Sequence, residues 1–303
     1  MSLTMSHRIE QMQISCLRLR VRVNNAAMLF LLTAAVALVS CASHPPLRNV
    51  GRDEAREGSV SLNESDHVMA VLWFQYAAEA RALYYQAYNL AKDRLDAAIS
   101  EPHPADSLAI IVDIDETILD NSPFQAYLIR KGRRFSPALW SKWTGARLNQ
   151  ALPGAQPFLA YAASNGVAVF YVSNRSAEEF EATARNLAAL KFPMADSSHL
   201  FLQEDKAGKE PHRREIQKKY KVVLLIGDNL GDFLADFDKR DYADRFQLTD
   251  VNQAEFGRRF IILPNPMYGE WESSLYPSRD LPEDVKTELR RSLLKSWQPS
   301  SSR

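Results

Sequence analysis

Short apolar runs recur along the chain after position 107, separated by stretches with helical spacing. The runs are rich in β-branched residues, which is typical of strands buried on both faces of a parallel sheet. We expect five strands, over residues 108–112, 167–172, 200–202, 222–226 and 260–263. Helices are expected between them, over residues 157–164, 176–190 and 209–220. This alternation predicts an α/β fold built on a doubly wound parallel sheet.

A long apolar stripe with helical spacing precedes the first strand. Its members are Met69, Trp73, Tyr76, Ala80, Leu83, Ala87, Leu90 and Ala98. Ser61 and Glu64 have the spacing of a capping box at the start of this helix, and Pro102 follows its end. About 35 helical residues would span about 50 Å, so we expect a kinked helix or two helices. A further amphipathic helix is predicted near the C-terminus by Val285, Leu289, Leu293 and Trp297.

The first forty residues have the pattern of an export signal. Arg18, Arg20 and Arg22 precede an apolar run over 26–39, which is too short to span a membrane but suits a signal peptide. The segment 38–41 (Leu-Val-Ser-Cys) resembles the bacterial lipobox, in which the Cys is lipidated and begins the mature protein. We therefore predict a removed signal peptide over 1–40, a lipid on Cys41 and a location in the outer membrane of a bacterial cell envelope. An ordinary signal peptide cleaved at the same place is the alternative.

The charge composition bears on which kinds of molecule the protein can bind. The 37 basic and 37 acidic residues give a formal net charge of zero, so no nucleic-acid partner is expected, because such a partner requires a basic surface. The two cysteines are Cys16 and Cys41. Loss of the leader and lipidation would leave no thiol for a disulfide. Residues 41–61 are polar and contain two adjacent prolines, which predicts a tether between the lipid and the fold.

Residues with reactive or ligating side chains follow three of the expected strands. Ligands bind at this edge of open parallel sheets. The residues are, in chain order, Asp113, Asp115, Thr117, Ser173, Asn174, Arg175, Lys209, Asp228 and Asp232. A lone Asp-x-Asp is common and says little. The paired carboxylates, the amide, the lysine and the second acidic pair, in this order, are poorly explained by chance.

The chemistry of these side chains fits phosphoryl transfer. Asp113 is predicted to be the nucleophile, and Asp115 the acid for the leaving group and then the base for water. Carboxylates of Asp113, Asp228 and Asp232 are oxygen ligands suited to Mg²⁺, and Asp115 can add its backbone carbonyl. In addition, Asn174 and Lys209 are expected to hold the transferring oxygens.

The joint pattern resembles the haloacid dehalogenase superfamily. Its four motifs are matched by residues 113–117, 173–174, 209 and 227–232. The longer strings over 113–121 (DIDETILDN), 171–175 (YVSNR) and 264–271 (PNPMYGEW) are similar to bacterial class C acid phosphatases. The resemblance implies a haloacid dehalogenase-like core and a lipid-anchored 5'-nucleotidase that requires Mg²⁺. Motif three departs from the usual pattern, because both Lys206 and Lys209 are candidates there; we choose Lys209.

The spacing of the motifs predicts a cap over the site. Sixty residues separate Asp113 from Ser173, about twice what a crossover helix needs, so residues 122–150 are expected to be an insertion. We expect a small helical cap made by this insertion and the N-terminal helix. The predicted divisions are a leader (1–40), a tether (41–61), a helical segment (62–105), the phosphatase core (106–265) and a C-terminal segment (266–303).

Candidate substrate-binding residues lie in the motifs, the insertion and the C-terminal segment. They are Thr117, Ser173, Arg175, Trp140, Trp143 and Tyr268. The resemblance implies that aromatic side chains in such places stack on the base of a nucleoside monophosphate. Packing in the core is the alternative for each of them.

Other classes of function are disfavoured by missing motifs. No histidines are paired as in a zinc site, and neither a P-loop nor a Gly-x-Ser-x-Gly elbow is present. The sequence thus predicts a phosphomonoesterase with a small-molecule substrate. A phosphotransferase on the same scaffold and a surface ligand-binding lipoprotein with a vestigial site are the alternatives. A homodimer is left open.

Overall fold

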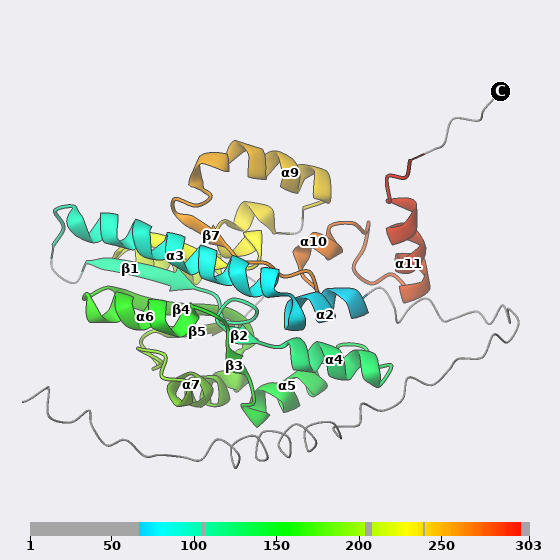
Figure 1. Ribbon diagram of the computed structural model, residues 1–303, viewed down its shortest axis with the longest axis horizontal. Coiled ribbons are helices and arrows are strands. Elements are labelled where there is room, and N and C mark those ends of the chain that lie inside the picture. The colour runs from blue at the N-terminus through cyan, green and yellow to red at the C-terminus, as the bar shows by residue number, and fades with distance from the viewer. Residues whose placement is uncertain (1–66, 105–106, 204–207, 239, 298–303) are drawn as a thin grey trace, which may run out of the picture. The chain divides into compact units, whose positions relative to one another are not determined.

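A five-stranded parallel sheet forms the centre of the protein (Figure 1). The computed structural model describes residues 67–104, 107–203, 208–238 and 240–297. The sheet order is β5–β4–β1–β6–β7, and its strands are β1 (Leu108–Val112), β4 (Ala168–Ser176), β5 (Leu200–Gln203), β6 (Lys221–Gly227) and β7 (Phe260–Ile262). All four strand pairs are parallel. The predicted strands and the doubly wound α/β class are confirmed.

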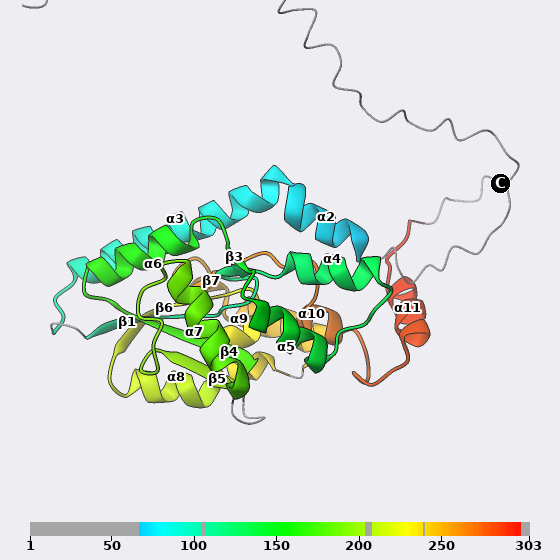
Figure 2. The same cartoon turned by 90° about the horizontal axis from the view of Figure 1, so that it is seen from below.

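Helices cover both faces of the sheet. Figure 2 shows α3 (Ala78–Ser100) and α6 (Ala155–Ser164) on one side of the strands and α8 (Glu210–Gln217) on the other. Alternate residues of β1 point to opposite faces of the sheet. Leu108, Ile110 and Val112 belong to the hydrophobic core that contains the buried side chains of α3 and α6. Ala109 and Ile111 belong to the core on the other face, which contains Ile216 of α8. Because both faces are buried, β1 reads as a continuous apolar run rather than an alternating one.

The predicted N-terminal stripe forms two helices, α2 (Val68–Tyr76) and α3, interrupted at Ala77, whose ψ of 124° is extended. Its predicted phase was partly wrong, because Met69 and Tyr76 are 70% and 79% exposed. Val71 and Phe74 are buried instead. Nearly every residue of α2 is apolar, so its periodicity has no unique phase. The predicted capping box at 61–64 lies outside the described residues.

The expected cap insertion contains two helices, α4 (Ser122–Arg130) and α5 (Pro137–Ala146). A two-stranded antiparallel pair, β2 (Leu119–Asp120) with β3 (Gln150–Ala151), joins the two ends of the insertion. Helix α2 packs on α4, and Gln75 Nε2 donates to Ser122 Oγ at 3.1 Å. The N-terminal helices and the insertion are therefore in direct contact.

Several helices after β4 complete the fold. They are η1 (Ala177–Glu179), α7 (Phe180–Ala189), η2 (Leu230–Asp232), η3 (Ala235–Phe237), α9 (Tyr242–Val251), η4 (Gln253–Glu255), α10 (Glu270–Ser273) and α11 (Glu283–Ser292). The sequence did not predict α9 and α10. No helix in the described ranges combines the length and apolar content needed to cross a membrane.

The apolar face predicted for the C-terminal helix was wrong in its orientation. Val285, Leu293 and Trp297 are exposed, and α11 ends before the last two. The face that meets the protein is largely polar: Thr287 is buried, and Arg290 forms an ion pair with Glu272 of α10 and donates to Tyr276 Oη at 2.8 Å. Through these contacts Arg290 joins α11 to α10 and to the segment that follows α10, while its ion pair with Glu283 lies within α11.

Candidate active site

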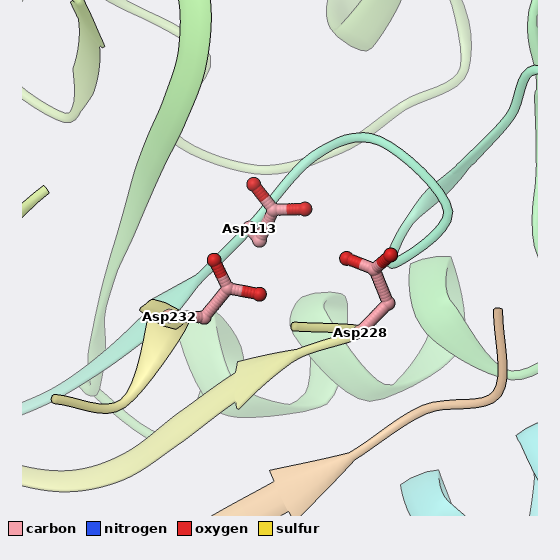
Figure 3. Close-up of side chains that lie close together, drawn as sticks. All are labelled: Asp113, Asp228 and Asp232. Carbon is pink, nitrogen blue, oxygen red and sulfur yellow. The ribbon is translucent and has the colours of Figure 1, made fainter. Parts of the chain in front are cut away.

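Three carboxylates meet at the carboxyl ends of β1 and β6 (Figure 3). Asp113 follows β1, Asp228 follows β6 and Asp232 ends η2, and one oxygen of each lies within 4.8 Å of the others. The Asp113 N–H donates to the Ile226 carbonyl at 2.9 Å, which holds the two strand ends together. β1 and β6 are neighbours where the strand order reverses, the place at which open α/β sheets bind ligands.

Lys209 is buried against this cluster. Its Nζ donates to Asp113 Oδ1 and, at 2.7 Å, to Asp232 Oδ1. Burial alone would lower the pKa of Lys209, but the carboxylates of Asp113 and Asp232 raise it above its ordinary value, so the ammonium stays charged. Of the two candidate lysines, Lys209 therefore reaches the cluster, whereas Lys206 lies outside the described residues.

The three aspartates carry more negative charge than Lys209 balances. Burial raises the pKa of Asp113 to about 7; Lys209 opposes this rise, whereas Asp232 and Asp115 add to it. The pKa of Asp228 is also raised, first by burial and then by Asp113 and Asp232. Clustered buried carboxylates of this kind are the ligand set that a hard divalent cation such as Mg²⁺ prefers. The residues present therefore fit a metal ion.

This electrostatic balance predicts a pH-dependent response to Mg²⁺. Between the ordinary Asp value of 3.8 and about 7, the folded metal-free protein holds a proton on Asp113 that the unfolded chain has released, so this group's contribution to stability falls as pH rises. A divalent cation such as Mg²⁺ that binds these carboxylates would have to displace that proton at low pH. We expect the Mg²⁺-induced rise in Tm to grow between about pH 5 and pH 7. A Mg²⁺-induced rise in Tm that stays constant or shrinks over this pH range would contradict the placing of the cation on Asp113.

Gly227 leaves room for Asp232. A Cβ at position 227 would lie 2.5 Å from Asp232 Cβ, closer than real Cβ contacts allow. We expect Gly227→Ala to displace Asp232, to cost about 1–3 kcal/mol of stability and to lower kcat/KM by about 10²-fold. In the matched control, Gly145→Ala on α5, the new Cβ meets nothing within 4 Å. Denaturant melts and phosphate release should separate the two variants, and equal behaviour would refute the packing argument.

Asp115 is held by a separate set of contacts. Arg175, at the end of β4, donates through Nη2 to Asp115 Oδ1 at 2.7 Å and through Nε to both oxygens at 3.1–3.2 Å. Arg175 is buried and also donates to Thr183 Oγ1 at 3.0 Å. Asn121 Nδ2 donates to Asp115 Oδ1 at 2.8 Å. The two motif-one aspartates therefore have different cationic partners, Lys209 for Asp113 and Arg175 for Asp115.

Glu116 is a site residue that sequence reasoning missed. It is completely buried, has a φ of +54°, and accepts hydrogen bonds from Tyr268 Oη and the Asn121 N–H. Its carbonyl accepts from Tyr84 Oη. Burial, followed by the charges of Asp115 and Asp228, raises its pKa. No motif spacing marks it, because its role depends on the distant partners that surround it.

The cluster opens into a cavity of about 980 Å³. The predicted site residues that line it are Asp113, Asp115, Ser173, Asn174, Arg175, Lys209, Asp228, Asp232, Trp140 and Tyr268. The lining also includes Arg133, Arg134 and Phe135 of the expected insertion, and Arg279, Glu283 and Lys286, which were not predicted. The last three come from the C-terminal segment, whose place beside the site follows from tertiary packing alone.

Two predicted substrate-binding residues are not among those that line the cavity. Thr117 is buried and donates to Asp113 Oδ2 at 3.1 Å. Trp143 donates through Nε1 to Asn121 Oδ1 at 2.7 Å and stacks on Phe124 with ring centroids 6.3 Å apart. Both therefore support neighbouring side chains, because their polar atoms are already engaged inside the protein.

Comparison with known proteins agrees with this site. Residues 27–271 match the family model described as "HAD superfamily, subfamily IIIB (Acid phosphatase)". The class C acid phosphatase of Bacillus anthracis is 41% identical, with a TM-score of 0.75 over 79% of this chain and 100% of that one. A structure of that enzyme with tungstate bound matches equally well.

A more distant curated relative is the stem 31 kDa glycoprotein of Glycine max, 24% identical over 200 residues, which are 64% of this chain and 69% of that one. The family match spans most of the chain, and the described fold is shared with a class C enzyme. The chain therefore belongs to the acid phosphatases of HAD subfamily IIIB, and is a phosphomonoesterase.

Proposed function

We propose that the protein is a Mg²⁺-dependent acid phosphatase that acts on nucleoside 5'-monophosphates through an aspartyl-phosphate intermediate. The observation that carries the proposal is the cluster of Asp113, Asp228 and Asp232 around Lys209, in the same cavity as Asp115. It combines a buried nucleophile, a cation site and a second carboxylate for proton transfer.

The residues divide the reaction into two displacements. Asp113 attacks phosphorus as the ester P–O bond breaks, and Asp115 gives its proton to the departing alkoxide. Asp115 then takes a proton from the water that attacks the aspartyl-phosphate, which releases inorganic phosphate and restores Asp113. Lys209 and Asn174, which both line the cavity, hold phosphoryl oxygens during both steps.

The same carboxylates are the proposed ligands of the cation. Asp113, Asp228 and Asp232 would hold Mg²⁺, with the Asp115 carbonyl as a further oxygen donor. When bound, the cation neutralises charge on the phosphoryl group. A structure of the Bacillus anthracis enzyme holds tungstate, a tetrahedral oxyanion shaped like phosphate, which supports phosphate binding in this family but does not bear on the choice of cation.

A nucleoside is favoured by the aromatic lining of the cavity. Trp140, Phe135 and Tyr268 all line it, and Phe135 is 57% exposed, so part of its ring is open to a ligand. Flat aromatic faces bind nucleobases by stacking. Trp140 and Phe135 also pack edge-on against Phe124, with ring centroids 5.3 and 6.4 Å apart, and all three aromatic residues of the lining are candidates for stacking.

We also propose that the enzyme is exported and anchored by a lipid on Cys41 to the outer membrane. The lipobox-like segment 38–41 supports this, and residues 1–66 lie outside the described ranges. Mass spectrometry of the membrane-extracted protein should find an acylated Cys41 at the N-terminus. Unchanged membrane retention of Cys41→Ser would refute the anchor.

The activity is tested by phosphate release from nucleoside monophosphates, sugar phosphates and an aryl phosphate, with Mg²⁺ and with EDTA. We expect turnover with Mg²⁺ alone, with the highest kcat/KM for 5'-nucleotides. Acid quenching during turnover should trap phosphate on Asp113. Transfer to an added alcohol in preference to water would instead identify a phosphotransferase, and no turnover at all would refute the proposal.

A further inference from the structure

The Asn121 side chain joins Asp115 to the cap. Asn121 is fully buried at the N-terminus of α4, and its Nδ2 donates to Asp115 Oδ1 at 2.8 Å and to Glu116 Oε2 at 3.3 Å. On the opposite side of the amide, Oδ1 accepts from Trp143 Nε1 at 2.7 Å and from Asn149 Nδ2 at 2.5 Å. One amide thus bonds to two motif-one carboxylates and to two cap residues.

We propose that Asn121 is a positioning residue that fixes the Asp115 carboxylate for proton transfer and makes its orientation depend on the cap. The inference rests on the proposed role of Asp115 as acid and base. It gives a function to a residue that lies outside the cavity lining and contacts the reaction only through its neighbour.

The contacts of Asp115 distinguish its two oxygens. Oδ1 accepts from Asn121 and from Nη2 and Nε of Arg175, whereas Oδ2 accepts only from Arg175 Nε, at 3.1 Å, among the residues the structure describes. Oδ1 is therefore nearly saturated, and Oδ2 is the oxygen left to carry the proton. Because Arg175 Nε donates to both oxygens, Asn121 Nδ2, which bonds to Oδ1 alone, adds to this difference and opposes an exchange of the two oxygens.

The two residues that donate to Asn121 Oδ1 are themselves held in place within the cap. Trp143 lies on α5 and stacks on Phe124 of α4, and Asn149 directly precedes β3. Two parts of the insertion, α5 and the residue before β3, therefore donate to one acceptor oxygen on a fully buried residue. Movement of α5 withdraws the indole N–H and leaves a buried acceptor undersatisfied, which is costly. Trp140, which lines the cavity, lies on that same helix, so contact with substrate there reaches Asp115 through Trp143 and Asn121.

The test uses the leaving group. Phosphoenzyme formation from p-nitrophenyl phosphate needs little help from an acid, whereas release of the alkoxide of adenosine 5'-monophosphate depends on it. We expect Asn121→Ala to lower kcat/KM for adenosine 5'-monophosphate by about 10²-fold and that for p-nitrophenyl phosphate less than about fivefold. Trp143→Phe, which keeps an aromatic ring but removes the indole N–H, should show a smaller selective loss.

Controls separate positioning from folding. Asn186→Ala on α7 also removes a buried amide, but one outside the cavity, and should leave both substrates unchanged. Equal losses on both substrates by folded Asn121→Ala, judged by its melting temperature, would overturn the proposal. If Asn121→Ala does not fold, the selective loss in Trp143→Phe decides the question. Failure of the wild type to hydrolyse either substrate would instead count against the proposed function.

Discussion

Asp113→Asn is expected to reduce kcat by about 10⁵-fold or more while the protein remains folded. The amide cannot attack phosphorus, so no aspartyl-phosphate forms and the water reaction has no intermediate to consume. The fold should survive, because an amide fills nearly the same volume and Lys209 keeps its 2.7 Å contact with Asp232. Initial rates with p-nitrophenyl phosphate measure the loss of kcat, and acid-quench trapping measures the loss of the aspartyl-phosphate.

The control for this variant is Asp236→Asn in η3. Asp236 is exposed and lies outside the cavity lining, so the same chemical change should leave kcat within about twofold, as for most surface substitutions. Wild-type turnover by Asp113→Asn, or phosphate trapped on another residue, would show that a different group is the nucleophile.

Removal of divalent cations is the second large effect. We expect EDTA to lower kcat/KM by about 10³-fold, equivalent to about 4 kcal/mol of charge stabilisation in the transition state. It should also lower Tm, because three clustered carboxylates, two of them buried, then face one another with Lys209 as their nearest cation. Added Mg²⁺ should restore both quantities, and calorimetry in Mg²⁺ and EDTA checks the second.

Asp228→Asn distinguishes a metal effect from a general salt effect. Asp228 is the cluster member without an ion pair to Lys209 among the described contacts, and burial and the neighbouring aspartates raise its pKa. The variant in EDTA should therefore melt at a higher temperature than the wild type in EDTA, since one like charge is gone. It should also lose most of the Mg²⁺ response. An unchanged Mg²⁺-dependent Tm would exclude Asp228 as a ligand.

Local sequence pattern was sufficient for the sheet. Each strand contains a short apolar run, and in β1 burial on both faces makes that run continuous, which distinguishes it from the more polar helices. It was insufficient for α2, α9 and α11. In α2 almost every residue is apolar, while α11 contacts Glu272 and Tyr276 through Arg290, so apolar periodicity pointed to the wrong face.

The candidate site, too, was predictable from the sequence in one part and not in another. The sequence determined its reactive members, because they follow consecutive strands of a parallel sheet and such strand ends converge. Asp113, Lys209, Asp228 and Asp232 were all brought together as expected. What the sequence could not determine is which groups support them, since Thr117 and Trp143 have the residue types of ligand-binding side chains.

Only the tertiary structure decided the roles that depend on long-range contact. Tyr268 reaches Glu116 across 152 positions, Arg175 reaches Asp115 across 60, and the C-terminal segment forms part of the cavity wall. A single sequence carries no periodic or spacing signal for such pairs, because their geometry is set by how whole elements pack. The sequence by itself determined the sheet, the reactive strand ends and thus the class of chemistry; the packing of helices and cap decided which side chains line, hold and enclose the site.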